Sequence, residues 1–486
     1  MFLTQLQPPQ VGRLPENLYR RIGVQPLGDP YWLDFNTDLA AEIGLDNDVW
    51  QSEPSLLFFS GSLKQPPHIG LATVYSGHQF GVYVPQLGDG RALSVGDWLD
   101  PQGQRWEWQL KGAGMTPFSR RADGRAVLRS SIREYLCSEA MHGLGIATTR
   151  ALALTGSNDA VYREQVETAA VVTRVAPSFI RFGHFEYLYH SGRHEQIQTL
   201  ADYVMDLAYP ECRQAEQPYL ALFTAISQRS AELVAAWQSV GFCHGVLNSD
   251  NMSVLGLTLD YGPFGFLDAF DWHHVCNHSD TGGRYAYNQQ PYIVQWNLSC
   301  LASAFLPLVA EADLVAVLNG FAGQYQAAYG QRMRAKLGFQ TEQAEDGALI
   351  KALLDGLQQQ QVDFTRWFRA LATVTKAGEG LPEALAALLQ EPSALASWCA
   401  DYRHRLAAET ATDAQRAAAM NAVNPHYVLR NHLLEQAIAA AKQGDHREIA
   451  RLRQCLRQPF TEEAAYAAYA ELPPAWAKEI AVSCSS

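Results

Sequence analysis

The segment from His244 to Asn251, followed by Asp260, is the feature that most limits how this chain can fold. It reads His-Gly-Val-Leu-Asn-Ser-Asp-Asn and separates two parts of different character. Period-two patterns typical of strands precede it, and long helical patterns follow it. A polar loop between a β-rich and an α-rich part predicts two layers of structure that meet at a ligand site.

The segment has the layout of a protein-kinase catalytic loop and of the metal-binding Asp that follows it. Val246, however, stands where a kinase carries its catalytic Asp. Asn251 and Asp260 still supply the hard oxygen atoms that Mg²⁺ prefers, and Asp250 adds a third oxygen donor or a general base toward an incoming hydroxyl. The pattern therefore predicts a nucleotide site that either leaves the nucleotide unused or uses it differently from a kinase.

Composition narrows the class of protein. The 486 residues are 48% hydrophobic and 11% aromatic, which indicates a folded globular chain, and the net charge of −13 argues against broad nucleic-acid binding. There is no run of about 18 apolar residues and no secretory or transit signal, so we expect no membrane span and a cytoplasmic location. The eight cysteines are scattered without a CxxC pair, which fits a reducing compartment and disfavours a zinc site.

The first part of the chain shows strand and helix patterns around Lys111. This residue ends an alternating strand, and Glu134, in the helix that follows, is expected to pair with it as in kinases. We expect Gly143 to cap that helix. The predicted strands begin near Ala92 and cover 105–111, 146–154 and 169–176, and the predicted helix covers 124–142.

The second part is dominated by helices. We expect one over 219–240 that stops at Gly241, a short strand with Leu257 and Leu259, a helix over 290–308, and Ala- and Leu-rich helices beyond 312. The predicted fold is α+β: a bilobed protein-kinase-like fold with an extended helical C-terminal region. The N-terminal lobe would cover residues 1–198, with nucleotide-binding strands and a helix. The C-terminal lobe would cover 199–486, with the catalytic loop and a helical extension.

Several segments could hold phosphates. The turn Gly88-Asp89-Gly90-Arg91 precedes a strand, and its glycines let the backbone approach a phosphate, although such a turn is usually only a connection. The basic segment 120–129 could hold a polyphosphate, or Asp123 could simply cap a helix there. Arg174 and Arg181 follow or end an apolar strand, so they should face a cleft as phosphate ligands or form structural ion pairs.

Histidines contribute less to the predicted chemistry. His244 is interpreted as a hydrogen-bonded anchor of the loop. His273, His274, His278 and Asp280 could form a metal cluster, but their spacing matches no familiar zinc motif, so we favour ordinary loop polarity.

Several strings together resemble the selenoprotein O family. They are Tyr-Ser-Gly-His-Gln-Phe-Gly at 75–81, Gly-Asp-Gly-Arg at 88–91, Gln-Leu-Lys-Gly at 109–112, the Arg-rich segment 117–129, the loop 244–251 and the C-terminal Ser-Cys-Ser-Ser. The resemblance covers nearly the whole chain. It implies a kinase-like pseudokinase that transfers AMP from ATP, bound in an inverted orientation, to Ser, Thr or Tyr hydroxyls of proteins, with release of pyrophosphate.

The resemblance also implies roles for individual residues. Asp250 would be the proton acceptor, and Asn251 and Asp260 would bind Mg²⁺, with Mn²⁺ as an alternative metal. Cys484 stands where eukaryotic relatives carry selenocysteine. It could be an idle exposed thiol, or it could pair with Cys276 and restrain the active-site loop. The expected partners are ATP and hydroxyl-bearing protein substrates, with no nucleic acid or membrane, and the chain is expected to be a monomer. The residues implied in nucleotide binding are Gly88, Gly90, Arg91, Lys111, Asp123, Gly124, Arg174, Arg181 and Asp260.

Two other functions remain open from the residues alone. One is a phosphotransferase of kinase-like fold, since loops of similar layout occur in antibiotic kinases, although those usually carry Asp at the position of Val246. The other is a non-catalytic nucleotide-binding scaffold.

Overall fold

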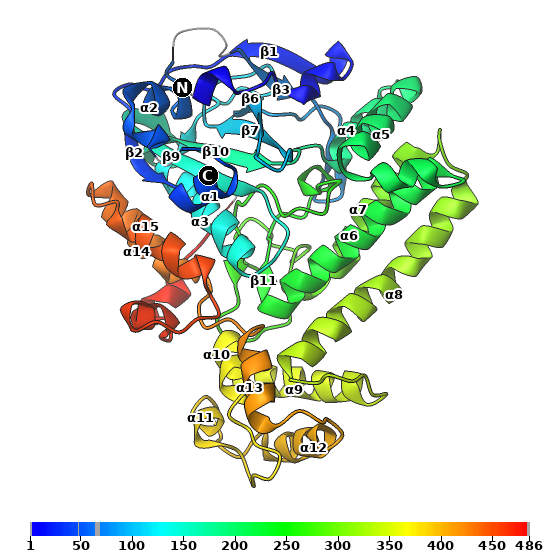
Figure 1. Ribbon diagram of the computed structural model, residues 1–486, viewed down its shortest axis with the longest axis vertical. Coiled ribbons are helices and arrows are strands. Elements are labelled where there is room, and N and C mark those ends of the chain that lie inside the picture. Colours follow the sequence, from blue (N-terminus) through cyan, green and yellow to red (C-terminus); the bar gives the residue numbers. More distant parts are fainter. Residues whose placement is uncertain (1, 47, 64–68, 484–486) are drawn as a thin grey trace.

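The protein has a mixed α+β architecture, with an antiparallel sheet in its N-terminal part and helices in its C-terminal part (Figure 1). This confirms the α+β class expected from the sequence. The computed structural model describes residues 2–46, 48–63 and 69–483. No helix within these ranges is long and apolar enough to cross a membrane.

The main sheet has the strand order β1-β3-β6-β7-β10-β9-β2, with β8 paired to β10, and all its neighbouring strands are antiparallel. Two small sheets, β4–β5 and β11–β12, lie outside it. The strands of the main sheet are β1 (Tyr19–Gly23), β2 (Tyr31–Phe35), β3 (Ile69–Thr73), β6 (Ala92–Leu99), β7 (Arg105–Lys111), β8 (Ala126–Val127), β9 (Arg150–Tyr162) and β10 (Val166–Ala176). The small sheets consist of β4 (Gly77–Gln79), β5 (Val82–Val84), β11 (Phe242–Cys243) and β12 (Gly265–Phe266).

Strand β7 has the bounds that its period-two pattern predicts, 105–111. It lies between β6 and β10, so that Lys111 is paired with Ala92 on one side and Val172 on the other. Trp108 and Leu110 are buried in the apolar core on one face. The polar face is buried as well, because Gln109 accepts a hydrogen bond from the guanidinium of Arg174.

Helix α3 (Leu128–Gly143) packs on β9 and β10 and brings Glu134 toward the sheet. The expected start at residue 124 is wrong. The N-cap is Val127 and has no side-chain cap, because Asp123 bonds elsewhere. The expected cap at Gly143 is also wrong: Gly143 is the last helical residue, and the left-handed turn that follows falls on Gly145, with φ of 70°.

The C-terminal part confirms the long helix before the loop, which ends at Gly241 with φ of 72°. The expected strand with Leu257 and Leu259 is wrong, since Thr258 makes only an isolated bridge to Thr148, and the chain pairs as β12 further on. The helices outside α3 are α1 (Thr37–Glu42), α2 (Glu53–Phe59), α4 (Phe182–His190), α5 (His194–Ala208), α6 (Pro218–Val240), α7 (Gln290–Phe305), α8 (Glu311–Lys336), α9 (Asp346–Gln360), α10 (Phe364–Leu371), α11 (Glu383–Ala386), α12 (Ala396–Leu406), α13 (Asp413–Asn421), α14 (Asn431–Lys442) and α15 (Arg447–Arg457).

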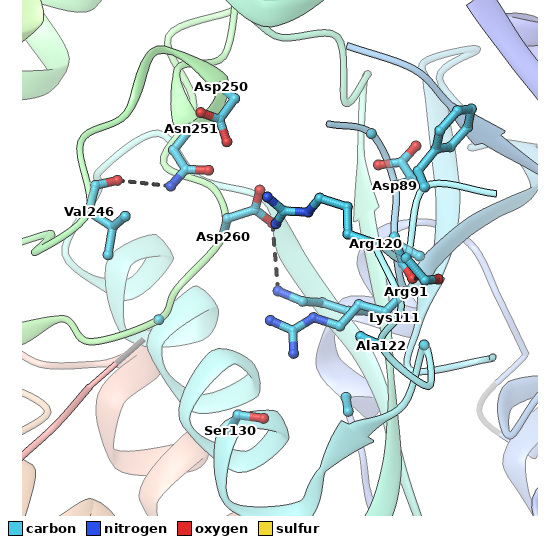
Figure 2. Close-up of a pocket in the computed structure, with 18 of the residues that line it drawn as sticks. Asp89, Arg91, Lys111, Arg120, Ala122, Ser130, Val246, Asp250, Asn251 and Asp260 are labelled. Atoms are coloured by element: carbon cyan, nitrogen blue, oxygen red, sulfur yellow. Dashed lines mark hydrogen bonds and ion pairs between the residues drawn. The ribbon is translucent and has the colours of Figure 1, made fainter. Parts of the chain in front are cut away.

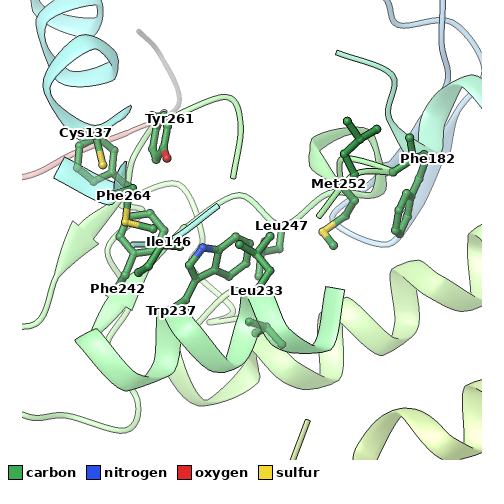
Figure 3. Close-up of a cluster of buried hydrophobic side chains, with 14 of the residues drawn as sticks. Cys137, Ile146, Phe182, Leu233, Trp237, Phe242, Leu247, Met252, Tyr261 and Phe264 are labelled. Atoms are coloured by element: carbon green, nitrogen blue, oxygen red, sulfur yellow. The ribbon is translucent and has the colours of Figure 1, made fainter. Parts of the chain in front are cut away.

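The loop between β11 and β12 is anchored in the core by its apolar residues. Leu247 and Met252, on either side of its polar stretch, are buried in one cluster with Trp237 of α6 (Figure 3). A short 3₁₀ turn, Ser249–Asn251, lies between these two anchors. The polar side chains are therefore fixed by burial of their apolar neighbours.

The last helices return to the N-terminal part. Helices α14 and α15 pack on α3, and α15 also contacts β2 (Figure 1). Arg453 of α15, which is 3% exposed, lies 2.7 Å from Asp34 and 3.1 Å from Asp38. The helical extension thus supports the helix that carries Glu134.

Candidate nucleotide-binding site

A cavity of about 520 Å³ lies between the main sheet, α3 and the loop 244–263. This volume is within the range of small-ligand sites, roughly 300–1,000 Å³. Seven basic and five acidic side chains line it, so its formal charge is positive although the chain's is −13. All of the site residues expected from the sequence line this one cavity: Gly88, Gly90, Arg91, Lys111, Asp123, Gly124, Arg174, Arg181, Asp250, Asn251 and Asp260.

Lys111 forms the expected ion pair with α3. Its Nζ lies 2.5 Å from Oε2 of Glu134 and 3.6 Å from Oδ1 of Asp260 (Figure 2). Glu134 also accepts a hydrogen bond from Arg174 at 3.0 Å. Burial lowers the pKa of the Lys111 ammonium, against the opposing effect of the Glu134 carboxylate. The network therefore holds two cations, from β7 and β10, at the same end of the cavity.

Asp260 joins these cations to the loop. One oxygen lies 2.5 Å from Arg174, and the other forms an ion pair with Arg181. Burial alone would raise the pKa of Asp260, but Arg181, Arg174 and Lys111 outweigh it and hold the pKa well below its usual range. Its φ of 58° is left-handed, a strained conformation that persists only where surrounding contacts impose it. The carboxylate is therefore ionised and fixed between the sheet and the loop.

Asn251 offers an oxygen toward the same space. Its Nδ2 donates to the carbonyl of Val246 at 2.9 Å, which leaves the amide oxygen as the atom available to a cation (Figure 2). The amide oxygen of Asn251 and the carboxylate of Asp260 are hard donors that fit Mg²⁺. A metal bound to Asp260 would compete with Arg174 and Arg181 for that carboxylate. The two guanidinium groups could then form hydrogen bonds with phosphate oxygens in place of the carboxylate.

Asp250 lies on the loop wall of the cavity and is 6% exposed. Gln79 donates to its Oδ2 at 3.2 Å, while its Oδ1 is buried without a hydrogen-bond partner among the described groups. Burial raises the pKa of the Asp250 carboxyl to about 7, although Gln79 and Arg181 act to lower it. Asp250 is therefore a buried carboxyl group on the cavity wall that is more easily protonated than an exposed aspartate.

The Gly88-Asp89-Gly90 turn forms another wall, and both glycines are required sterically. A Cβ at Gly88 would lie 2.8 Å from the carbonyl oxygen of Thr73, and one at Gly90 would lie 2.8 Å from that of Phe118. The Asp89 side chain accepts hydrogen bonds from the amide and hydroxyl of Thr73, at 2.8 and 2.6 Å, which closes the turn. The turn is therefore built for close packing of the backbone against its surroundings.

The segment 115–125 lies beside this turn. Thr116 donates to the carbonyl of Asp89 at 2.7 Å. Gly124, with φ of 69°, approaches the backbone of Gly114 so closely that a Cβ would lie 2.2 Å from it. Asp123 receives two hydrogen bonds from Arg163, at 2.8 and 2.9 Å, which lowers its pKa. Asp123 thus holds a cavity-lining arginine and does not cap α3.

The structure also shows where the histidines of the sequence analysis lie. His244 is buried and its Nε2 lies 3.0 Å from the carbonyl of Leu259, so it anchors the loop as expected. In the described ranges the only group spaced to hold a metal ion through His, Cys or carboxylate atoms is His78, Glu186 and Cys300, and the histidines at 273–278 are not part of it. Cys484 lies outside the described residues, whereas the carbonyl of Val482 accepts from the amide of His278.

Sequence reasoning gave no role to several polar cavity residues, among them Gln79, Arg163 and Asn248, and it did not predict the structural role of Asp89. Gln79 belongs to the string at 75–81, which contributes to the family resemblance but carries no chemical pattern of its own. Its contact with Asp250 spans 171 positions and has no local signal.

A cavity lined by several arginines, a paired lysine and polar oxygen atoms has the charge and chemistry of a site for a phosphate-bearing ligand such as a nucleotide. Comparison with known proteins identifies the family: the sequence profile described as "Protein adenylyltransferase SelO" matches residues 2–457, and the chain belongs to this family. It is 52% identical to the "Protein nucleotidyltransferase YdiU" of Paraburkholderia xenovorans over 96% of this chain and 93% of that protein. It is 54% identical to the protein of the same name from Burkholderia thailandensis, over 95% and 92% of the two chains.

Proposed function

We propose that the cavity binds ATP with its triphosphate inverted relative to a kinase, and that AMP passes from it to a hydroxyl group of a protein side chain. The observation that carries this proposal is the arrangement of charge. Lys111 and Arg91 lie on the sheet side of the cavity (Figure 2), and Arg174 belongs to strand β10 of the same sheet, so the three would hold the β- and γ-phosphates. Asp250 lies on the opposite, loop side of the cavity, beyond Asp260 as seen from Lys111 (Figure 2). The α-phosphate would then lie close to Asp250.

In this scheme the Asp250 carboxylate accepts the proton of the acceptor hydroxyl. The hydroxyl oxygen forms a bond to the α-phosphorus, and the bond from that phosphorus to the oxygen bridging the α- and β-phosphates breaks, so that pyrophosphate leaves. Arg174, Arg181 and Lys111 stabilise the charge on the leaving pyrophosphate. Asn251 and Asp260 would hold Mg²⁺, or Mn²⁺, which when bound neutralises phosphate charge.

The presence of valine at 246 is consistent with this chemistry. Val246 lines the cavity and its carbonyl accepts from Asn251, so the position orients a metal ligand in place of supplying a base. Asp250 supplies the base four residues later. The proposed architecture is correspondingly a bilobed kinase-like fold, with an N-terminal lobe over 1–198 and a C-terminal lobe with a helical extension over 199–486.

The decisive experiment uses ATP labelled at either the α- or the γ-phosphate, with the purified protein, Mg²⁺ or Mn²⁺ and a protein extract as acceptor. We expect covalent label on protein from α-labelled ATP only, resistant to RNase and lost in Asp250→Asn. Label from the γ position alone would identify a phosphotransferase. Absence of both labels, with ATP-dependent partner binding retained in Asp250→Asn, would identify a scaffold.

A further inference from the structure

The β4–β5 hairpin binds the polar loop at three successive positions, and none of its residues has a role in the scheme above. The amide of His78 donates to the hydroxyl of Ser249 at 2.7 Å. The side chain of Gln79 donates to Asp250 at 3.2 Å, and the amide of Phe80 donates to the side chain of Asn248 at 3.3 Å. Three consecutive residues of the hairpin region thus contact three consecutive residues of the loop, 248–250.

The hairpin approaches Asp250 more closely than most side chains would permit. A Cβ at Gly77 would lie 2.7 Å from both Cβ and Oδ1 of Asp250 and 3.0 Å from its amide nitrogen. Glycine is thus required at 77 for the strand to lie against the loop. The carboxylate of Asp250 fills the space that a larger residue at 77 would take.

The hairpin also holds a strained residue at its tip. Phe80 has φ of 50°, a left-handed conformation that is an outlier for a bulky residue. Its amide is held by Asn248 and, at 2.8 Å, by the hydroxyl of Tyr285. Strain of this kind persists only where surrounding contacts impose it, and it is concentrated at functional sites.

A buried pair anchors the hairpin from behind. Nδ1 of His78 lies 2.6 Å from Oε2 of Glu186 on α4, and the Glu186 side chain is fully buried. The ring of His78 also packs edge-on against Trp296 of α7, with the ring centroids 5.3 Å apart. Position 79 is therefore fixed between two helices and the loop.

These contacts give the two oxygens of Asp250 different environments. Oδ2 accepts from Gln79, whereas Oδ1 is buried without a partner among the described groups and belongs to a side chain that lines the cavity. Oδ1 also packs against Gly77, so both oxygens are held by the hairpin. We propose that Gln79 is a positioning residue that, by its hydrogen bond to Oδ2, holds the Asp250 carboxylate in the orientation that accepts a proton from the acceptor hydroxyl. This rests on the proposed function in one respect, the use of Asp250 as base.

The test replaces Gln79 with methionine, which has similar length but no amide donor, and with glutamate, which has the same shape and a repelling charge. We expect kcat for AMP transfer to fall about tenfold to a hundredfold in Gln79→Met, as for loss of one hydrogen bond to a charged group, and at least as far in Gln79→Glu. KM for ATP, the ATP dissociation constant and the melting temperature should stay close to those of the wild type. Gln214→Met, at an exposed position outside the cavity, is the matched control.

Two results would overturn the positioning role. One is a kcat for Gln79→Met within twofold of the wild type. The other is a fall in kcat accompanied by matching changes in ATP affinity and melting temperature, which indicates general damage to the fold. The proposed function fails separately, if the wild-type protein measured beside the variants transfers no label from α-labelled ATP.

Discussion

Lys111 and Glu134 form an ion pair at 2.5 Å that joins the central strand β7 to helix α3 on the wall of the cavity. Glu134 serves two cations at once, because its other oxygen accepts from Arg174. The carboxylate thus sets the direction of both positive groups that would meet the phosphates. Its charge, more than its shape, should matter for ATP binding.

Glu134→Gln keeps the shape of that side chain and removes its charge. We expect ATP binding to weaken about tenfold to a hundredfold, the effect of losing the orientation of charge-assisted hydrogen bonds. Titration calorimetry with ATP and Mg²⁺ measures it. The matched control is Glu167→Gln on β10, which removes the carboxylate that pairs with Arg129 of α3. This variant should bind ATP as the wild type does. Equal affinity in Glu134→Gln and wild type would contradict the role of the pair.

The pH dependence of AMP transfer should report on Asp250. Burial raises its pKa to about 7, and a general base acts only in its deprotonated form. The rate should therefore rise with pH and level off above about 7, or lower when Mg²⁺ binds nearby, since a cation favours the charged form. Initial rates from pH 5 to 9 measure this limb. Any residual rate of Asp250→Asn should not show this rise with pH. The same rise in that variant would assign the titration to another group.

Metal dependence should depend on Asp260. In the wild type, Mg²⁺ should increase the stabilisation by ATP in a thermal-shift assay, and EDTA should abolish the increase. Asp260→Asn leaves Arg174, Arg181 and Lys111 without their shared carboxylate. We therefore expect this variant to bind ATP without metal at least as well as the wild type, to show no Mg²⁺ effect and to lose AMP transfer. Asp355→Asn, at an exposed ion pair on α9, should behave as the wild type. A full Mg²⁺ effect in Asp260→Asn would exclude this ligand.

The parts of the site that could be predicted from the sequence are those that depend on patterns among residues close together in the chain. The alternation over 105–111 predicts β7 and the position of Lys111 at its end, and the pattern of the loop predicts that Asn251 and Asp260 lie at one site, as they do in the cavity. Helix α3 was placed too early because Asp123 has the chemistry of a cap, yet its carboxylate pairs with Arg163, 40 positions away. The sequence alone does not distinguish an aspartate that caps a helix from one that pairs with a distant arginine.

The β4–β5 hairpin could not be predicted either, because its contacts also join residues that are far apart in the sequence. Strands β4 and β5 have three residues each, too few for a period to be visible, and all their partners in the loop lie far along the chain. Phe80 adopts a left-handed φ that its side chain disfavours, so no rule of local propensity indicates a turn there. Such contacts follow from tertiary packing that overrides local preference.

The docking of α15 onto the N-terminal part should be a large contribution to stability. Arg453 is nearly fully buried and contacts Asp34, Asp38 and the side chain of Asn36. Arg453→Met keeps the apolar stem but leaves the buried Asp34 without its cation, which we expect to lower the free energy of unfolding by about 3 kcal/mol. Denaturant titration measures this value. Arg447→Met, on the same helix with a side chain that is 90% exposed and paired only with Asp445, should leave it close to the wild-type value. Because α15 packs on α3, we also expect weaker ATP binding by Arg453→Met. A loss of stability no greater than that of Arg447→Met would show that the ion pairs of α15 do not hold the helical extension in place.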